Sequence, residues 1–468
     1  MSTLNQYSFK AVLGATIIAF MVSCERKISD DAVLPTFSTT AEVFTDNFIG
    51  LGTDFYFPFA DAKPDVFSVD NTQGFQSNSS IRIDVPNATD PTGSYAGAIF
   101  RVDGAGRNLT KYDALTFYVK ASQGVVLGEV GFGIDYIKDK YKVSTQNVNV
   151  GTSWSKVTIP IPMASKLLEE RGVFWFAAGS NGTGGAGYTL WFDEIKFEKL
   201  GNILPVKSNI LGGTTTTVNT FVGSTILLSG LNQLFNLVNG QDITVLGAAN
   251  YYTFLSSDTS VAKINELGEI SVIGTGTAEI TGSLGGFASD GKLIIKSSGN
   301  LPAAPTPPYA QVDVKSLFSE SYIKATEINY APGFGGSTTQ TTLLNTSSGA
   351  VLQYTNNNYT GIIFINPIDA AALGFLHIDA YVQNPAATIG IQIRDIGANK
   401  ILETDVNTGF PIADDKDYRT SLSGFQTGVW KSFDIPLGGN ILNQKNNLGA
   451  LIITGGPDFI LDNIYFHK

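Results

Sequence analysis

The amino-acid sequence predicts an all-β protein in which two jelly-roll β-sandwiches flank a smaller central β-sandwich. The 468 residues include 50 Gly, 30 Phe and 18 Tyr but only 15% charged residues, a composition typical of turns and aromatic strands. No segment has the periodicity of a long amphipathic helix, and residues 163–171 fit only one or two helical turns. Two segments near the ends of the chain repeat one order of strands, which indicates a duplicated module.

The N-terminus has the pattern of an export signal. Lys10 precedes an apolar stretch over residues 11–22, which is too short to span a bilayer but has the length of a signal-peptide core. The stretch ends in Met21-Val22-Ser23-Cys24, and this tetrapeptide resembles the lipobox of bacterial lipoproteins, with Met21 in the usual place of Leu. The resemblance implies that residues 1–24 are a lipoprotein signal peptide and that Cys24 is diacylated. The alternative is an ordinary secretory signal in which Cys24 is incidental.

Residues 25–41 follow as a polar stretch that buries little apolar surface, so we expect a flexible tether. The acidic residues directly after Cys24 resemble the surface-export signal of glycan-degrading Gram-negative bacteria. This resemblance implies an outer membrane lipoprotein that faces the cell exterior. The alternative is a plain solvated spacer. No later segment is long and apolar enough to cross a membrane.

The repeat appears in three pairs of segments with alternating or β-rich character. The paired segments are residues 114–120 with 376–383, Trp154 to Pro160 with Trp430 to Pro436, and 190–197 with 460–466. The spacing from Trp to Pro is the same in both copies, and each Pro fits the end or edge of a strand, where a missing N–H costs nothing. We therefore expect jelly rolls over residues 42–200 and 312–468.

The central region, residues 201–298, is rich in Thr, Val, Gly and Ser. Its segments 256–265 and 268–281 have the order strand, Gly turn, strand, Gly-Thr-Gly corner, strand. This order resembles the bacterial immunoglobulin-like domain of the second group, which implies a central Ig-like β-sandwich. Residues 299–311 contain closely spaced prolines and predict an extended, semi-rigid linker.

The two outer modules resemble the carbohydrate-binding jelly rolls found beside glycoside hydrolases and in surface glycan-binding lipoproteins of Sus-type uptake systems. The segments that carry the resemblance are 159–162 and 187–195 in the first module, and 316–322 and 459–466 in the last. The resemblance implies a protein that captures a polysaccharide, with a β-glucan such as laminarin favoured. It also implies a Sus-type transporter as partner and a lipid anchor in the outer membrane.

Several other function classes lack the residues that they need. The net charge of −11 repels a phosphate backbone, so we expect no nucleic-acid partner. The sequence has no Gly-x-Ser-x-Gly motif and no Glu-x-Asp-x-x-Glu strand, and Asp193 and Glu194 are adjacent and point to opposite faces. We therefore predict that the protein is not an enzyme and needs no cofactor. Two rivals stay open: an endoglycosidase with accessory modules, and an adhesin or structural stalk.

A sugar site needs a flat aromatic side chain and a few fixed polar groups. The candidates for glycan binding are Glu129, Asp135, Tyr136, Trp175 and Trp191 in the first module and Phe334, Tyr359, Arg394 and Tyr418 in the last. For each aromatic residue the alternative is core packing. Related modules often carry Trp in place of Phe334. Arg394 either offers a planar fork to vicinal hydroxyls or pairs with Asp395 or another carboxylate. We expect Trp154 and Trp430 to have structural roles, because they occupy equivalent positions before an apolar strand in the two modules.

Asp193 and Asp462 occupy matching positions near the ends of the last strands of the two modules. The resemblance implies that such a carboxylate holds a structural calcium ion together with an acid near the first strand, here Asp46 or Glu320. The alternative is a surface aspartate at a strand end. The two histidines, His377 and His467, lack the sequence spacing of a zinc site. We expect His377 to be a strand residue whose ring nitrogens are hydrogen-bonded, and His467 to lie in a frayed C-terminal end.

Overall fold

The computed structural model describes residues 37–468 except 61, 138, 202, 238, 384–385, 406–407 and 457. The predicted signal peptide, Cys24 and most of the tether lie outside the described residues. The described part is all-β, which confirms the predicted class. Its helices are single 3-10 turns: η1 (Ala164–Lys166), η2 (Asn181–Thr183), η3 (Leu211–Gly213), η4 (Ala249–Tyr251), η5 (Gln311–Asp313) and η6 (Gly439–Ile441). Among these residues, no helix has the length and apolar character needed to span a membrane.

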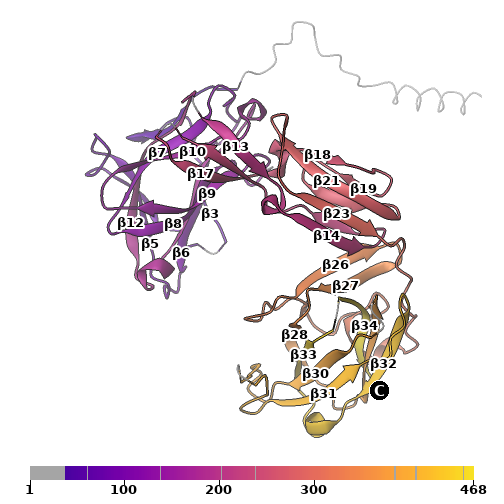
Figure 1. Cartoon of the computed structure of the whole chain (residues 1–468). Helices are drawn as coiled ribbons and strands as arrows, with labels where there is room; N and C mark the ends of the chain where they lie inside the picture. The colour runs from indigo at the N-terminus through magenta and orange to yellow at the C-terminus, as the bar shows by residue number, and fades with distance from the viewer. Residues whose placement is uncertain are drawn as a thin grey trace, which may run out of the picture.

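The first module is a sandwich of two antiparallel sheets (Figure 1). One sheet contains β1 (Glu42–Thr45), β2 (Asn47–Phe48), β4 (Phe67–Asp70), β5 (Ser80–Val85), β7 (Ala114–Ala121), β10 (Ser155–Pro160) and β12 (Tyr188–Glu198). The other contains β3 (Tyr56–Pro58), β6 (Tyr95–Arg101), β8 (Val125–Phe132), β9 (Val143–Val150) and β11 (Gly172–Gly179). In the first sheet β12 pairs with β5, β7 and β1, and the order in the second is β3-β6-β11-β8-β9.

Part of the central region is joined to the first module. Strands β13 (Leu204–Asn209), β16 (Asn232–Asn236) and β17 (Asp242–Gly247) extend the second sheet, because β17 pairs with β9 through Leu246 opposite Ser144 and Gly247 opposite Val143. One continuous hydrophobic core runs from the first module into the central region. The open edge of β9 is thereby covered, as an exposed sheet edge requires.

The remaining central strands form two small sheets. One contains β14 (Thr215–Thr220), β18 (Thr253–Ser256), β21 (Gly276–Leu284), β22 (Phe287–Ala288) and β23 (Lys292–Ser297), and the other contains β15 (Thr225–Leu227), β19 (Ala262–Ile264) and β20 (Glu269–Val272). Strand β14 pairs with β23 in parallel, while the other pairs in these sheets are antiparallel.

The Pro-rich segment is extended but docked, not a free spacer. Leu301 is buried in a cluster with Phe221 of the central region and Tyr381 of the last module. The indole N–H of Trp430 donates a hydrogen bond to the carbonyl of Pro302 at 2.6 Å. Further along, the ring of Tyr309 stacks on His467 at a centroid distance of 4.1 Å. These contacts fix the segment along the last module.

The last module repeats the sandwich of the first. One sheet contains β24 (Val314–Phe318), β26 (Gln340–Thr346), β27 (Gly349–Thr355), β29 (Phe375–Val382), β32 (Trp430–Pro436) and β34 (Phe459–His467). The other contains β25 (Ile328–Asn329), β28 (Tyr359–Ile368), β30 (Ile389–Asp395), β31 (Lys416–Leu422) and β33 (Leu448–Thr454). Their orders are β26-β27-β34-β29-β32, with β24 on β34, and β25-β28-β33-β30-β31.

The predicted repeat is confirmed strand by strand. Strands β7, β10 and β12 of the first module correspond to β29, β32 and β34 of the last, with the same pairings. Pro160 lies opposite Ala114 and Pro436 lies opposite Phe375, in both cases at the end of an edge strand. The predicted position of these prolines is therefore correct.

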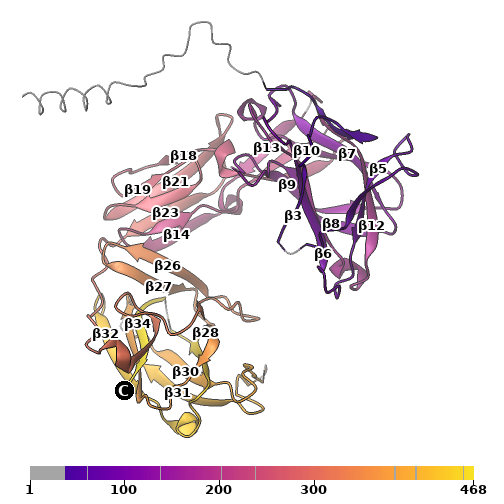
Figure 2. The same cartoon turned by 180° about the vertical axis from the view of Figure 1, so that it is seen from behind.

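The described residues form an arch, seen from both sides in Figures 1 and 2. Strands β3 and β6 of the first module and β28, β30 and β31 of the last module lie toward the inner side of this arch. The second sheets of both sandwiches thus lie toward the inner side of the arch.

Candidate functional site

The second sheet of the last module carries a cleft of about 880 Å³. Its floor is formed by β30, β31 and β33, and its two walls come from the loops that flank them. The lining residues include Phe334, Gly335, Asn358 and Tyr359 on one wall, Gly390, Gln392, Arg394, Arg419, Thr420, Ser421 and Thr454 on the floor, and Leu402, Thr404, Asp405, Thr408 and Gly409 on the other wall. The lining combines aromatic, hydroxyl, amide and charged groups, as a site for a polar ring with an apolar face requires.

Two aromatic rings form one wall of this cleft. The rings of Phe334 and Tyr359 are nearly parallel, with 15° between their planes and 6.5 Å between centroids. The hydroxyl of Tyr359 donates to the carbonyl of Gly335, and the hydroxyl of Ser337 donates to the carbonyl of Tyr359 at 2.6 Å. A Cβ on Gly361 would lie 2.7 Å from the Phe334 ring, so only glycine leaves room for this ring position. Both residues were predicted as candidates, and the structure brings them together.

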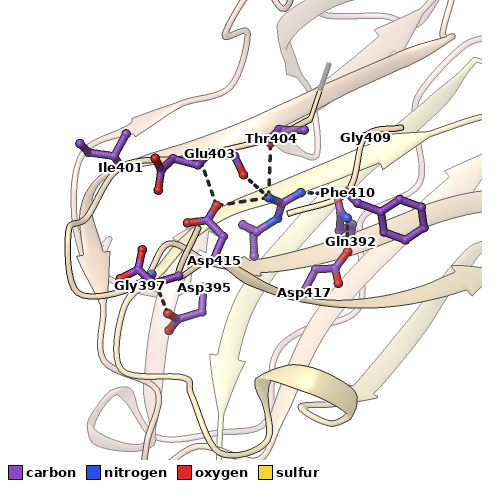
Figure 3. A network of polar contacts seen from close by, with 12 residues as sticks. Gln392, Asp395, Gly397, Ile401, Glu403, Thr404, Gly409, Phe410, Asp415 and Asp417 are labelled. Atoms are coloured by element: carbon purple, nitrogen blue, oxygen red, sulfur yellow. Dashed lines mark hydrogen bonds and ion pairs between the residues drawn. The ribbon is translucent and has the colours of Figure 1, made fainter. Parts of the chain in front are cut away.

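Arg394 is buried below the cleft floor and binds the loop that forms the opposite wall. Its side chain is fully buried, and Nη1 lies 3.2 Å from Oδ2 of Asp415 and 3.0 Å from the carbonyl of Glu403. Figure 3 shows Glu403, Thr404 and Asp415 grouped on one side of this network and Gln392 and Asp417 on the other.

Of the two sequence interpretations of Arg394, the structure selects pairing with a carboxylate. That carboxylate is Asp415, because Asp395 instead accepts backbone hydrogen bonds from Gly397 and Asn447.

Burial governs the charges of this ion pair. It raises the pKa of the Asp415 carboxyl above its ordinary value, although hydrogen bonds from the Glu403 amide and from Arg394 oppose this shift. Burial also lowers the pKa of the Arg394 guanidinium. Each member therefore depends on the other for its charged state.

The prediction of Tyr418 as a glycan-binding residue is wrong for this cleft, because its side chain points to the other face of β31. It lies opposite Ile393 and packs against the hydrophobic core of the module. Its neighbour Arg419 lies opposite Gln392 and lines the cleft, since successive strand residues alternate between faces.

Arg419 and Phe410 were missed by the sequence analysis. The Arg419 side chain is 42% exposed, and its Nε donates to Oδ2 of Asp417 at 2.6 Å. Its guanidinium lies 4.1 Å from the centre of the Phe410 ring, a residue that is 55% exposed. The amide of Gln392 also donates to Oδ2 of Asp417. The alternation of β31 was the available signal for Arg419.

In the first module, Trp175 and Glu129 lie on the same face of the second sheet. The ammonium of Lys142 joins them, at 4.7 Å from the Trp175 ring centre and 3.7 Å from Oε1 of Glu129. Trp175 is buried, and its indole N–H donates to the carbonyl of Phe132 at 3.2 Å. Phe59 packs edge-on against this indole at 6.4 Å, and was missed although it ends the aromatic run Phe55 to Phe59.

The other candidates of the first module do not join this pair. Asp135 is buried, and its Oδ1 accepts a hydrogen bond from the amide of Ile137, so it shapes the loop between β8 and β9. Tyr136 in the same loop is exposed and has a positive φ of 60°. Trp191 belongs to β12 in the other sheet, where its indole donates to Asp70 at 2.9 Å. Trp175 and Trp191 thus lie in different sheets and do not share one site.

The predicted calcium ligands differ between the two modules. Both oxygens of Asp193 accept backbone hydrogen bonds, from Glu194 at 2.7 Å and from Phe75 at 2.6 Å. Burial raises the pKa of Asp193, and the nearby charges of Glu194 and Asp46 add to the shift. Since backbone donors already serve both oxygens of Asp193, this position fits a cation poorly.

Asp462 in the last module has a different environment. It accepts one backbone hydrogen bond, from Asn463 at 2.6 Å. Burial raises its pKa to about 7 against that hydrogen bond, and the charges of Asp379 and Glu320 contribute. The Asp462 carboxyl therefore resists ionisation, and a hard cation such as calcium would favour its ionised form.

Comparison with known protein families gives a match in the first module. Residues 39–199 match the family model "Carbohydrate binding domain 30". The chain contains a carbohydrate-binding domain. No curated protein sequence matches the chain significantly.

Solved structures of carbohydrate-binding modules are also similar to this chain. A family 30 module has 18% identity over 34% of this chain and 97% of its own, with a TM-score of 0.26. The family 30 module of a cellulosomal cellulase of Clostridium thermocellum has 18% identity over 36% and 96%, with a TM-score of 0.23. A tandem of two family 22 modules from Paenibacillus barcinonensis has 12% identity over 93% and 100%, with a TM-score of 0.21.

Proposed function

We propose that the protein is a non-catalytic glycan-binding protein of the bacterial cell surface that holds a polysaccharide, with a neutral β-glucan favoured, for an uptake system of the Sus type. The match of residues 39–199 to a carbohydrate-binding domain supports glycan binding. The cleft of the last module, with the parallel rings of Phe334 and Tyr359, supplies the surface on which a pyranose ring stacks. The polar floor around Gln392, Asp417 and Arg419 supplies hydrogen-bond partners for hydroxyl groups.

The ligand class can be tested with the chain from residue 25 onward. Affinity electrophoresis in gels that contain soluble β-glucans, mannans, xylans or pectins measures retardation of the protein by each polymer. The proposal expects retardation by at least one neutral β-glucan. Retardation by pectins alone would contradict the choice of a neutral ligand, and migration unaffected by any polymer would contradict glycan binding.

The proposed location at the outer membrane depends on Cys24. Two acyl chains anchor a protein stably, and Cys24 is the only cysteine in the chain. In the full-length protein we expect Cys24→Ala to move the protein from the membrane fraction to the soluble fraction after cell breakage, while Ser23→Ala leaves it with the membranes. Mutant and wild-type proteins that partition alike would show that no lipid is attached at Cys24.

The proposal includes a structural calcium ion at Asp462 and Glu320. Because the folded-state pKa of Asp462 is raised from its ordinary value of 3.8 to about 7, the folded state keeps a proton that the unfolded state has lost. Without calcium, we expect the free energy of unfolding to fall as the pH rises from about 4 to about 7, and calcium to oppose this fall by binding the ionised form.

Melting temperatures of the wild type and Asp462→Asn, measured with chelator and with calcium at about pH 5 and about pH 8, test this expectation. The substitution should remove the effect of calcium on the melting temperature. It should also remove the pH dependence that Asp462 contributes, since only the wild type titrates at this position. Equal stabilisation of both proteins by calcium would place the ion elsewhere.

A further inference from the structure

The outer face of the first sheet of the last module carries a polar cluster that the glycan cleft does not use. Both histidines of the chain are in it: His377 on β29 is 7% exposed and His467 on β34 is 2% exposed. His377 Nδ1 lies 2.7 Å and His467 Nε2 lies 3.0 Å from the same oxygen, Oδ1 of Asp434 on β32. One ligand atom from each of these residues lies within 4.8 Å of the others. Three neighbouring strands thus converge on one point.

All four ring nitrogens of these histidines face oxygen atoms. On the outer side of the cluster, His377 Nε2 lies 3.3 Å from Oδ1 of Asp379, and His467 Nδ1 lies 2.7 Å from the carbonyl oxygen of Lys468. A neutral imidazole carries a single N–H and donates a single hydrogen bond. Two neutral rings therefore supply hydrogens for only two of the four contacts, and at the other two contacts a nitrogen lone pair faces an oxygen atom.

The outer contacts are those that orient metal-binding histidines. Such a histidine usually donates its second N–H to a carboxylate or a backbone carbonyl, which fixes its tautomer and ring position. Asp379 serves His377 in this way and the Lys468 carbonyl serves His467. With the outer nitrogens protonated, Nδ1 of His377 and Nε2 of His467 present lone pairs toward Asp434.

The β framework does not itself require these side chains. In the first module the equivalent positions hold Thr116, Thr158 and Glu198, as the matching strand registers show. The Asp434 side chain is 47% exposed and has room to move outward. The small shift needed to admit an ion at about 2.0–2.2 Å from each ligand atom is therefore available.

We propose that His377, Asp434 and His467 bind a divalent transition metal ion, with zinc as the ion that best suits two imidazole nitrogens, one carboxylate oxygen and a water molecule. This donor set suits zinc, copper or nickel and does not suit calcium. Because Tyr309 stacks on His467, the ion would also fix the end of the Pro-rich segment to the last module.

The test uses residues 25–468 expressed without a histidine tag, so that His377 and His467 are the only imidazoles present. Isothermal titration with Zn²⁺ should show one equivalent bound with a micromolar or lower Kd. His377→Gln and His467→Gln should each weaken binding by at least 10-fold, and Asp379→Asn by roughly 10- to 100-fold through loss of orientation. Glu403→Gln, in an acidic cluster of the same module, is the control and should leave the affinity unchanged.

A second measurement keeps the proposal testable if a histidine variant fails to fold. Electron paramagnetic resonance of Cu²⁺ bound to the wild type should show coupling to two nitrogen nuclei, and Zn²⁺ should displace this signal. Absence of saturable binding, a spectrum without nitrogen coupling, or equal affinity in the folded double variant His377→Gln/His467→Gln would each overturn the proposal.

Discussion

Replacing Arg394 by Ala should lower the free energy of unfolding of the last module by about 3–5 kcal/mol, because it leaves the Asp415 carboxylate buried and unpaired. The substitution also removes the hydrogen bond that ties the Glu403 carbonyl to β30 at 3.0 Å. Chemical denaturation followed by tryptophan fluorescence measures the change, since Trp430 reports on this module.

The matched control is Lys324→Ala in the same module. Lys324 pairs with Glu327 at 3.9 Å with both side chains exposed, so its loss should cost less than about 1 kcal/mol. If Arg394→Ala proves as mild as this control, the guanidinium does not hold the cleft wall as described.

The second large effect is expected on glycan binding. Phe334→Ala combined with Tyr359→Ala removes both faces of the aromatic wall, and loss of anchors of this kind costs about 2 kcal/mol or more, or roughly 30-fold in affinity. Titration of a short oligosaccharide of the glycan found by electrophoresis measures the change at this site without bridging to the first module. Unfolding should shift little, since neither residue is fully buried.

An exposed aromatic residue outside the cleft provides the control. Phe287 in β22 is highly exposed, and Phe287→Ala should bind as the wild type does. Unchanged affinity in the double cleft variant would rule out the Phe334 and Tyr359 wall as the binding surface.

The strands that the two outer modules share could be predicted because they have local signals. Alternating residues, a Trp-to-Pro spacing and Gly-rich turns each lie within a few positions of the strand that they define. The joining of β17 to β9 has no such signal, because the two paired positions, Leu246 with Ser144 and Gly247 with Val143, are far apart in the sequence. The shared sheet and core of the central region and the first module were therefore not predicted.

The candidate site was predictable where residue type alone was informative. Phe334 and Tyr359 lie in turn-rich segments and meet in the cleft. Tyr418 failed because a shift of one residue along a strand reverses the face, so that Arg419 lines the cleft instead. That Trp175 and Trp191 lie in different sheets could not be predicted, because assignment to one sheet or the other depends on long-range pairing. The histidine cluster could not be predicted from spacing, since its members come from three strands.

The central claim, glycan binding without cleavage, is tested most directly by measuring both in one sample. Residues 25–468 are incubated with the polysaccharide selected by electrophoresis, and bound protein and reducing ends are followed over time. The account predicts saturable binding while the reducing ends stay at the level of a protein-free control. Reducing ends that accumulate in proportion to the purified protein would contradict it, and would indicate an endoglycosidase with paired carboxylates about 5–9 Å apart.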